Sequence, residues 1–493
     1  MEEKIVFKIR NLIWHLIPPM VFVLIMLVYF PFGERFEMDL DEGINLIRAL
    51  LVAHDYALYS DIWSDQPPLF TYLLAGIYQI FGNNVVINRV FVLILSAMLM
   101  WAFVQILRKV WGNVHAVVGV VLLLLLPNYA KLSVSVMVGL PSLALAMLSM
   151  LALITWHQDR RTFLLILSAL VLGLSVLTKL FTGFLAPIFI FGIFAAEYTR
   201  SRKEPNWQGI LRPVAIWASI FTITTAGIGL LIVGPDIISE LIQPHIAARG
   251  LILVTQIKTF TINEYLLKAW TILFLAFIGA LFTLKSRRWL SLYPIAWLVT
   301  AYLLLSQYSP VWSHQQLLVT LPATMLAAIA AGESLRMIPQ FFHPRLLLSV
   351  NGILFVAGII GLVLVISINT PILSAELKPS PSLPTSSLRE TSAENRYLRR
   401  LKNRASETNW IVTDLPMYAY RMDILVPPEL AVFTWKRIET GNLTYEQVQE
   451  TIDEYQPEQV LMGRFMFPEL EEYLDEHYRL LDIPTDAKLY IRK

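Results

Sequence analysis

The sequence predicts a polytopic α-helical membrane protein with about 11 spans, helices at the outer face of the membrane and a small C-terminal α/β domain. Hydrophobic residues make up 56% of the 493 residues, and the mean hydropathy is +0.59, which is unlike a water-soluble protein. Charged residues make up only 15%, and they are sparse up to about residue 370 and dense after it. The chain is therefore divided into a membrane part and a polar C-terminal part.

Composition also excludes several classes of function. The net charge of +2 gives no clustered excess of Lys and Arg, so nucleic acid is not an expected partner. The chain has no cysteine, which excludes disulfides, thiolate metal sites and a thiol nucleophile.

The first apolar run follows Lys4, Lys8 and Arg10 and extends to about residue 32. About 20 residues cross the hydrocarbon core of roughly 30 Å, and no small-x-small cleavage site follows, so we expect an uncleaved first span. Together with this run, eleven segments are candidate spans: 13–32, 85–107, 113–130, 139–156, 162–178, 182–198, 211–233, 267–284, 289–308, 314–333 and 346–370.

Residues 67–82 are also apolar, but their 16 residues would give a helix of only about 24 Å. The loop charges decide how to interpret this segment, because short cytoplasmic loops are enriched in Lys and Arg. If it does not span, the cytoplasmic loops hold the basic residues Arg108, Lys109, Arg160, Arg161, Arg200, Arg202, Lys203, Arg212, Lys285, Arg287, Arg288, Arg336 and Arg345. The short outer loops then hold only Lys131 and Lys179.

We therefore predict an interfacial or re-entrant helix at 67–82 on the outer face; the alternative is a short tilted span. The protein is expected in the plasma membrane, with a cytoplasmic N-terminus and an extracytoplasmic C-terminal domain. Residues 1–370 would form the transmembrane domain, and its outer loop 33–84 carries most of the candidate acidic residues.

The outer loop begins with a predicted helix that has two stripes. The apolar stripe, which we expect to lie on the membrane, consists of Leu40, Ile44, Ile47 and Leu51. The polar stripe consists of Asp41, Asn45 and Arg48. Asp41 and Glu42 fall at the N-terminal end, where the helix dipole stabilises carboxylates. An ordinary role for Asp41 would be that of a helix N-cap.

After the last span, residues 371–393 are rich in Pro and Ser and are predicted to form a linker. Residues 394–493 are predicted to form the α/β domain. Its expected helices are 394–405, 444–455 and 467–477, and its expected strands are 410–414, 459–463 and 488–493. It contains no Gly-rich phosphate loop and no nucleophile motif.

Several short motifs in the membrane part resemble the GT-C superfamily of membrane glycosyltransferases. They are Asp41-Glu42, Asp65-Gln66-Pro67-Pro68-Leu69, Asn88-Arg89, Thr178-Lys179 and His314 before the segment LLVTLPA. The chain resembles most closely glycosyltransferase family 39 and its bacterial relatives, which include protein O-mannosyltransferases and aminoarabinose transferases. The C-terminal segments IVTD, VPPEL and RIETGNLTYEQV also look like the soluble domain of such relatives.

The resemblance implies an enzyme that moves a sugar from a polyprenyl phosphate to an acceptor hydroxyl on a protein, glycolipid or glycan, with inversion. A hydroxyl needs a general base, and the resemblance assigns that role to Asp41. Glu42 and Asp65 would position the acceptor or bind a metal. No cofactor is firmly implied; a divalent metal is the alternative.

Lipid phosphate already leaves readily, so the site needs cations rather than a second carboxylic acid. The candidate donor-phosphate ligands are Arg89, Lys131, Lys179, His245, Arg249 and His314. The ordinary interpretation of Arg89, Lys131 and Lys179 is that they reach the lipid headgroups. For His245 and His314 it is that of structural histidines with satisfied hydrogen bonds.

The sequence departs from the family pattern at two positions. Gly139 stands where relatives often carry a second acid, and Gln66 stands where some have a basic residue, which puts a shared metal site and the phosphate contacts in question.

A transporter or lipid-linked sugar flippase is the alternative function, although no internal repeat is evident. A membrane scaffold would explain the C-terminal domain but not the acidic loop.

Overall fold

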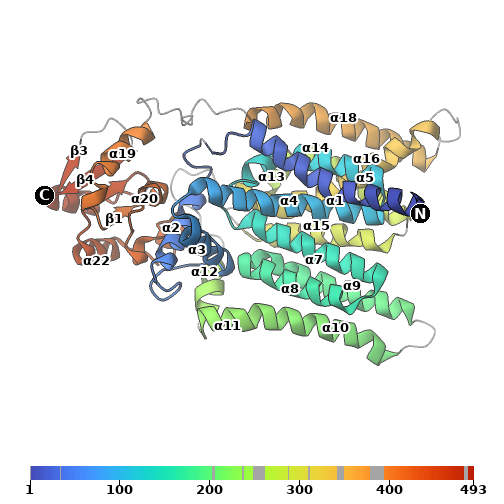
Figure 1. Cartoon of the computed structure of the whole chain (residues 1–493), viewed down its shortest axis with the longest axis horizontal. Helices are drawn as coiled ribbons and strands as arrows, with labels where there is room; N and C mark the ends of the chain where they lie inside the picture. Colours follow the sequence, from blue (N-terminus) through green and yellow to red (C-terminus); the bar gives the residue numbers. More distant parts are fainter. Residues whose placement is uncertain are drawn as a thin grey trace.

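The computed structural model describes most of the chain as a bundle of helices with an attached α/β domain (Figure 1). The described residues are 2–33, 35–201, 206–235, 238–247, 261–286, 288–308, 311–340, 349–377, 393–481 and 487–493.

The bundle consists of apolar helices that run roughly side by side (Figure 1). A helix satisfies its own backbone hydrogen bonds, which is why apolar segments cross a membrane in this form. The bundle helices are α1 (Glu2–Tyr29), α4 (Val85–Val110), α5 (Asn113–Leu124), α6 (Tyr129–Leu132), α7 (Gly139–Asp159), α8 (Thr162–Thr178), α9 (Leu185–Arg200), α10 (Trp207–Thr222), α11 (Ile228–Val233), α13 (Ile262–Lys268), α14 (Trp270–Ser286), α15 (Leu292–Leu305), α16 (Leu317–Met337) and α18 (Val350–Leu377).

Six of the described helices are long and apolar enough to cross a membrane, and counting α13 and α14 as one bent span makes seven. Four predicted spans correspond to shorter apolar helices: Ile13–Tyr29, Asn113–Leu124, Thr162–Thr178 and Trp289–Leu305. A turn interrupts the apolar run of α5, which ends at Leu124, and the chain resumes a helix only at Tyr129. The polytopic helical fold class is confirmed, with fewer full-length spans than the sequence predicted.

Two predicted boundaries differ from the structure. The segment predicted as a span at 267–284 is part of a helix pair that bends by 88° between α13 and α14. The linker was expected to begin at residue 371, but α18 continues through Pro371 to Leu377. Because a proline near a helix end does not necessarily stop the helix, composition alone placed this boundary too early.

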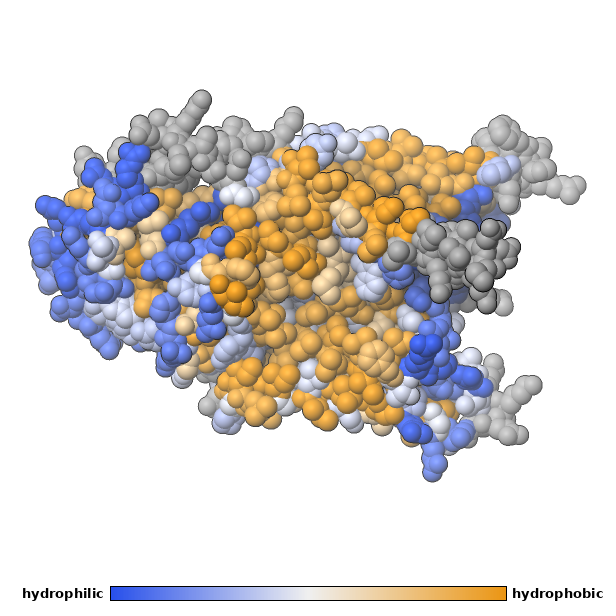
Figure 2. Space-filling view, in the orientation of Figure 1, coloured by the Kyte–Doolittle hydropathy of each residue, from blue (hydrophilic) through white to orange (hydrophobic). Residues whose placement is uncertain are grey.

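The apolar surface of the bundle lies between two hydrophilic ends (Figure 2). The loops predicted to be cytoplasmic meet at one of them, hereafter the basic end. There Arg160 pairs with Glu197, and Arg288 Nη1 donates a hydrogen bond of 2.8 Å to the carbonyl oxygen of Val110. The C-terminal domain lies at the opposite end, hereafter the domain end (Figure 1).

Three short helices lie at the domain end, between the bundle and the C-terminal domain (Figure 1). They are α2 (Leu40–Ala53), α3 (Leu69–Phe81) and α12 (Gln243–Ala247). Helix α3 covers the segment 67–82 and lies at the end of the bundle, beside α2 (Figure 1). Helix α2 also packs on α20 (Pro416–Met422) of the C-terminal domain.

The apolar stripe of α2 is buried inside the protein. Ile47 and Leu51 are fully buried in a core that they share with residues of the C-terminal domain, among them Met417 and Tyr420. The expectation that this stripe lies on the membrane is therefore wrong. The sequence predicted an amphipathic helix correctly, but the C-terminal domain covers the apolar side.

The C-terminal domain is a small α/β domain, as predicted. Its helices are α19 (Ala393–Lys402), α20, α21 (Trp435–Glu439), α22 (Tyr445–Tyr455) and α23 (Pro468–His477). Its strands are β1 (Ile411–Thr413), β2 (Gln459–Met462), β3 (Tyr478–Leu481) and β4 (Lys488–Arg492), in the order β1-β2-β4-β3. Strand β1 is parallel to β2, and β4 is antiparallel to both β2 and β3. Strand β3 was not predicted.

Candidate active site

A cavity of about 420 Å³ lies between the domain end of the bundle and the C-terminal domain. Residues from α2, the first loop, the bundle and the C-terminal domain line it together. The polar and charged side chains among them are Asp39, Asp41, Asn45, Arg48, Asp65, Gln66, Lys179, His245, Tyr308, Ser313, His314, Gln315, Thr434, Lys436 and Arg464. Aromatic side chains include Trp63, Phe181, Trp312 and Trp435.

The structure thus brings five predicted site residues to one cavity: Asp41, Asp65, Lys179, His245 and His314. They come from separate parts of the chain and meet because α2, α8 and α12 all end or lie at the domain end (Figure 1). The polar stripe of α2 also faces this cavity, since Asn45 and Arg48 line it with Asp41.

Asp41 lies in the first turn of α2, where the helix dipole favours a negative charge. Burial, the nearby Asp39 and the more distant Asp65 raise the pKa of Asp41 to about 6, although Lys179 and Arg48 act in the opposite direction. The alternative role as an N-cap is wrong, because Asp39 occupies the cap position and accepts a hydrogen bond of 3.4 Å from the backbone N–H of Asp41. Asp41 is therefore a cavity carboxylate whose pKa suits proton transfer near neutral pH.

Lys179 follows the last residue of α8 and is nearly buried. Among the described residues, none forms a hydrogen bond or ion pair with its ammonium group, which lies 5.8 Å from the centre of the Phe181 ring. Burial lowers the pKa of Lys179 to about 8, while Asp41 and Asp65 limit that shift. A Cβ atom added at Gly139 would lie 3.7 Å from Lys179 Nζ, so the small residue leaves room beside this cation.

Arg48 is held by neighbours on its own helix and in the following loop. Its Nη1 donates a hydrogen bond of 2.8 Å to Ser64 Oγ, and its Nη2 donates to Asn45 Oδ1. Asn45 in turn donates to the carbonyl oxygen of Val136 at 2.9 Å. This network fixes the polar face of α2 against the bundle and places a positive charge beside Asp41.

Asp65 is bound by a lysine of the C-terminal domain. Lys436 Nζ lies 2.5 Å from Asp65 Oδ2, and Gln66 Nε2 donates to Asp65 Oδ1 at 3.0 Å. Burial alone would raise the pKa of Asp65, but the charge and hydrogen bond of Lys436 hold it below its ordinary value. Asp65 is thus an ionised partner of Lys436 that joins the first loop to the domain.

His245 completes this contact. Its Nε2 lies 3.0 Å from the carbonyl oxygen of Asp65, so Nε2 carries the proton that it donates there. Its Nδ1 is then an acceptor, and Lys436 Nζ lies 3.3 Å from it. Burial lowers the pKa of His245, which agrees with a neutral ring. Both ring nitrogens are occupied, which leaves His245 no donor for a phosphate in this arrangement.

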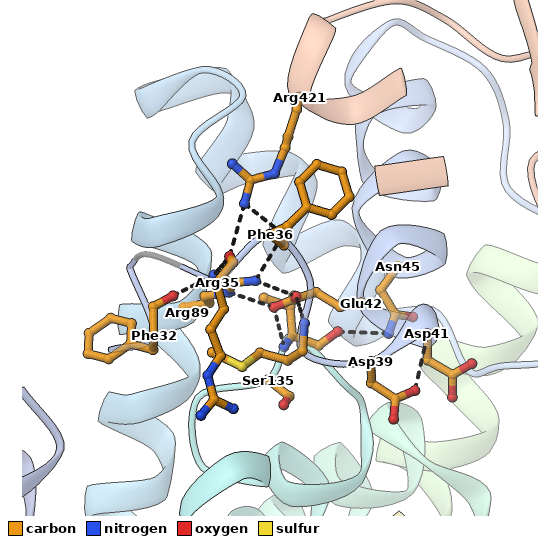
Figure 3. Close-up of polar contacts among 12 residues, drawn as sticks. Phe32, Arg35, Phe36, Asp39, Asp41, Glu42, Asn45, Arg89, Ser135 and Arg421 are labelled. Atoms are coloured by element: carbon orange, nitrogen blue, oxygen red, sulfur yellow. Dashed lines mark hydrogen bonds and ion pairs between the residues drawn. The ribbon is translucent and has the colours of Figure 1, made fainter. Parts of the chain in front are cut away.

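The structure does not bring Glu42 and Arg89 to the cavity. Figure 3 shows Glu42 directed toward Arg89, whereas the Asp41 side chain points away from this pair. The two form a fully buried, bidentate ion pair: Arg89 Nε lies 2.9 Å from Glu42 Oε1, and Arg89 Nη2 lies 2.6 Å from Glu42 Oε2. Arg89 Nη1 also donates to the carbonyl oxygens of Phe32 and Arg35, at 2.5 and 2.7 Å.

The remaining lone pairs of Glu42 are occupied as well. The backbone N–H groups of Met38 and Val136 donate to it at 2.9 and 3.3 Å. These contacts tie the first loop to α4 and to the segment before α7. We therefore replace the expected roles of Glu42, in acceptor or metal positioning, and of Arg89, in phosphate binding, by a structural role.

The other candidates have different positions. Lys131 does not line the cavity, but its Nζ lies 3.7 Å from Oδ2 of Asp39, which does. Arg249 lies outside the described residues. His314 lines the cavity from the turn before α16, and none of the described residues forms a hydrogen bond or ion pair with its ring. His314 and Lys179 thus remain as bundle candidates for the donor phosphate.

The proposed metal ligands do not fit a metal in this arrangement. Glu42 is saturated by Arg89 and two N–H groups, and Asp65 is paired with Lys436. Within the described part of the chain, no group of three His, Asp or Glu side chains is arranged for metal binding. We derive no step through a metal.

The cavity residues from the C-terminal domain were not predicted. Trp435, Lys436 and Arg464 follow no motif, and only docking of the domain on the bundle brings them to the cavity. Asp39 could have been found, because an Asp just before an amphipathic helix is a typical N-cap signal.

Comparisons with known proteins agree with this fold. Residues 65–223, less than half of the chain, match the family described as dolichyl-phosphate-mannose-protein mannosyltransferase. No curated protein sequence matches the chain. The structure of ArnT from Cupriavidus metallidurans bound to undecaprenyl phosphate is similar, with a TM-score of 0.60, 14% identity, and coverage of 96% of this chain and 97% of that one.

The archaeal oligosaccharyltransferase AglB from Archaeoglobus fulgidus, in complex with an inhibitory peptide and a dolichol-phosphate, is also similar. Its TM-score is 0.53 and its identity 11%, over 97% of this chain and 74% of that one. At such low identities the structural matches show a shared fold. The fold and the partial family match together support a membrane glycosyltransferase of GT-C type, similar to glycosyltransferase family 39, and confirm the resemblance inferred from the sequence.

Proposed function

We propose that this protein transfers a sugar from a polyprenyl-phosphate-linked donor to an acceptor hydroxyl at the outer face of the membrane, with Asp41 as general base. One observation carries the proposal: the Asp41 carboxylate and the unpaired Lys179 ammonium line the same cavity at the end of an apolar helix bundle. The two solved relatives reported above hold undecaprenyl phosphate or dolichol-phosphate. A lipid phosphate is therefore the donor chemistry that we extend to this chain.

The proposed reaction needs one base and one phosphate-binding group. Asp41 takes the proton of the acceptor hydroxyl, whose oxygen attacks the anomeric carbon of the sugar. The bond from that carbon to the phosphate oxygen breaks, and its electron pair stays on the lipid phosphate. Because attack and departure occur on opposite sides of the carbon, a single step inverts the anomeric configuration.

The phosphate gains negative charge as it leaves, so a fixed cation lowers the barrier. Lys179 is suited to this role because none of the described residues forms a hydrogen bond or ion pair with its ammonium group. Lys179 directly follows α8 at the end of an apolar helix, which supports a contact with the phosphate of a membrane-embedded polyprenyl chain. His314 offers a second polar contact from the opposite part of the bundle.

The sidedness of the site follows from the loop charges. The predicted cytoplasmic loops, as far as the structure describes them, lie at the basic end, and the cavity lies at the other end. The positive-inside rule then puts the cavity and the C-terminal domain outside the cytoplasm. Reporter fusions after Asp41 and after residue 393 should both report an extracytoplasmic position.

The direct test is sugar transfer from a synthetic polyprenyl-phosphate sugar by the purified protein in detergent. Asp41→Asn should abolish transfer while leaving expression and thermal stability unchanged. Asp61→Asn is the matched control, because Asp61 is an exposed carboxylate of the same loop that caps the Ala57 N–H at 2.8 Å. Full activity of Asp41→Asn would remove Asp41 from the base role, and product of retained configuration would contradict direct inversion.

A further inference from the structure

The C-terminal domain contributes two cations to the cavity, Lys436 and Arg464. Lys436 is paired with Asp65 and serves to dock the domain. Arg464 has no such partner: within the described part of the chain, its guanidinium forms no hydrogen bond or ion pair. Its Nη1 is buried as well as unpartnered. Because burying an unpartnered donor costs free energy, its position calls for a functional explanation.

The backbone that carries Arg464 is held firmly. Asp414 is fully buried, and its carboxylate accepts hydrogen bonds from the backbone N–H groups of Gly463, Arg464 and Phe465, at 2.8, 2.6 and 2.6 Å. The guanidinium carbon of Arg464 also lies 4.5 Å from the centre of the Phe465 ring. The loop is thus fixed at its backbone, and the side chain is supported by an aromatic face.

Burial lowers the pKa of Arg464, and several carboxylates act in the opposite direction without binding it. Asp414, Asp41, Glu37 and Asp39 favour its charged form, yet none of them is within ion-pair distance. They compensate the charge at a distance and leave the donor groups free. A guanidinium offers five N–H donors in a planar arrangement that matches a phosphate.

We propose that Arg464 is a donor-phosphate ligand that acts with Lys179, so that the C-terminal domain completes the active site. The two cations line the same cavity, Lys179 from the bundle and Arg464 from the domain. Neither forms a hydrogen bond or ion pair with a described side chain. The donor phosphodiester carries one negative charge and a second develops as the sugar leaves, so a phosphate between the two cations would be balanced most fully as the bond breaks. This inference rests on the proposed function, because it assigns a second ligand to the same donor.

The proposal gives the C-terminal domain a direct part in the reaction. As the bond between the sugar and the phosphate breaks, the electron pair moves onto the phosphate, and Arg464 would stabilise that charge by two parallel hydrogen bonds. By holding the phosphate, Arg464 would also orient the donor so that its anomeric carbon faces the acceptor oxygen that Asp41 deprotonates.

The main alternative is that Arg464 only compensates the acidic group formed by Glu37, Asp39 and Asp41. In that case it would act on the reaction through the pKa of Asp41. The two roles differ in what they change: a phosphate ligand changes donor affinity, whereas charge compensation changes the pH dependence of turnover.

The experiment measures binding of undecaprenyl phosphate, without sugar, to the full-length protein in detergent, together with transfer kinetics. Arg464→Met should raise the Kd for this lipid and the KM for the donor at least tenfold, because a charge-assisted hydrogen bond is lost. The KM for the acceptor should not change. The fall of the transfer rate at acidic pH, which follows protonation of Asp41 and is called the acidic limb of the pH profile, should not shift. Arg464→Lys should recover part of the affinity, since it keeps the charge but not the paired geometry.

Arg479→Met is the matched control, because Arg479 is exposed on β3 of the same domain and does not line the cavity. Thermal unfolding of each variant checks that it folds, and if Arg464→Met does not, Arg464→Lys and Arg464→Gln carry the comparison. Unchanged lipid affinity with a displaced acidic limb would overturn the proposal in favour of charge compensation.

Failure of this inference and failure of the proposed function give different results. If the wild-type protein transfers sugar and Arg464→Met does so with the same donor KM, the inference fails and the proposed function stands. If the wild-type protein transfers no sugar, but its affinity for undecaprenyl phosphate depends on Arg464, the reaction is wrong and the phosphate site is supported.

Discussion

Glu42 and Arg89 offer a sharp test of whether a buried cation in this protein is structural or binds phosphate. Both side chains are fully buried, and they share two hydrogen bonds of 2.9 and 2.6 Å. Glu42→Gln removes the negative charge that balances Arg89 and leaves its guanidinium with neutral acceptors only, and Arg89→Met leaves Glu42 with two N–H donors. Removing one member of a buried pair costs about 3–5 kcal/mol, because the other charge stays buried.

The assay is equilibrium unfolding in detergent of the two single variants and of the double variant Glu42→Gln/Arg89→Met. Each single variant should lose about 3–5 kcal/mol of unfolding free energy, and the double variant should lose clearly less than the sum, because it leaves no unpaired charge. Arg161→Met, an exposed residue at the basic end, serves as the control. Wild-type stability of Arg89→Met combined with weaker binding of undecaprenyl phosphate would refute the structural role and restore Arg89 as a phosphate ligand.

Three further predictions follow from the structure. The transfer rate should fall below about pH 6, where Asp41 becomes protonated, and above about pH 8, where Lys179 loses its proton. Lys179→Arg should remove the fall at alkaline pH. A transfer rate that does not change with pH would contradict both assignments. Gly279→Ala should cost about 1–3 kcal/mol in unfolding free energy, because its Cβ would collide with a backbone carbonyl of α16. Gly76→Ala, which lies inside α3 and meets no atom within 4 Å, should be neutral or slightly stabilising in the same assay. Lys436→Met should lower the unfolding free energy by about 1–3 kcal/mol, because it removes the ion pair that docks the domain, and it should also reduce sugar transfer. Unchanged transfer activity would show that docking does not depend on this ion pair.

Much of the helical fold could be predicted because lipid imposes strict rules on sequence. Apolar segments must be helical to satisfy their backbone groups, so their existence and approximate ends were visible in the composition. The predictions failed where a turn or a bend interrupts an apolar run, as between α5 and α6 or between α13 and α14. Such interruptions depend on packing between helices, which hydropathy does not report.

The candidate site was predictable only in part. Lys179 and His314 stood out because ionisable residues beside apolar runs are costly unless they have a role, whereas Asp41 and Asp65 stood out through the resemblance to the family. Their partners were not visible. Lys436 turns Asp65 from a candidate metal ligand into half of an ion pair, and it is 371 positions away in the chain.

The sequence by itself determined a membrane helix bundle, a separate polar domain and the gathering of basic loops at one end, because each of these follows from local composition and charge. Only the tertiary structure decided which charged side chains form ion pairs with each other and which remain available to a ligand. Glu42 and Arg89 looked like Asp41 and Lys179 in the sequence, yet the first two neutralise each other in a buried pair and the second two face a shared cavity. The physical reason is that the free energy of a charge depends on its neighbours in space, and those neighbours come from distant parts of the chain.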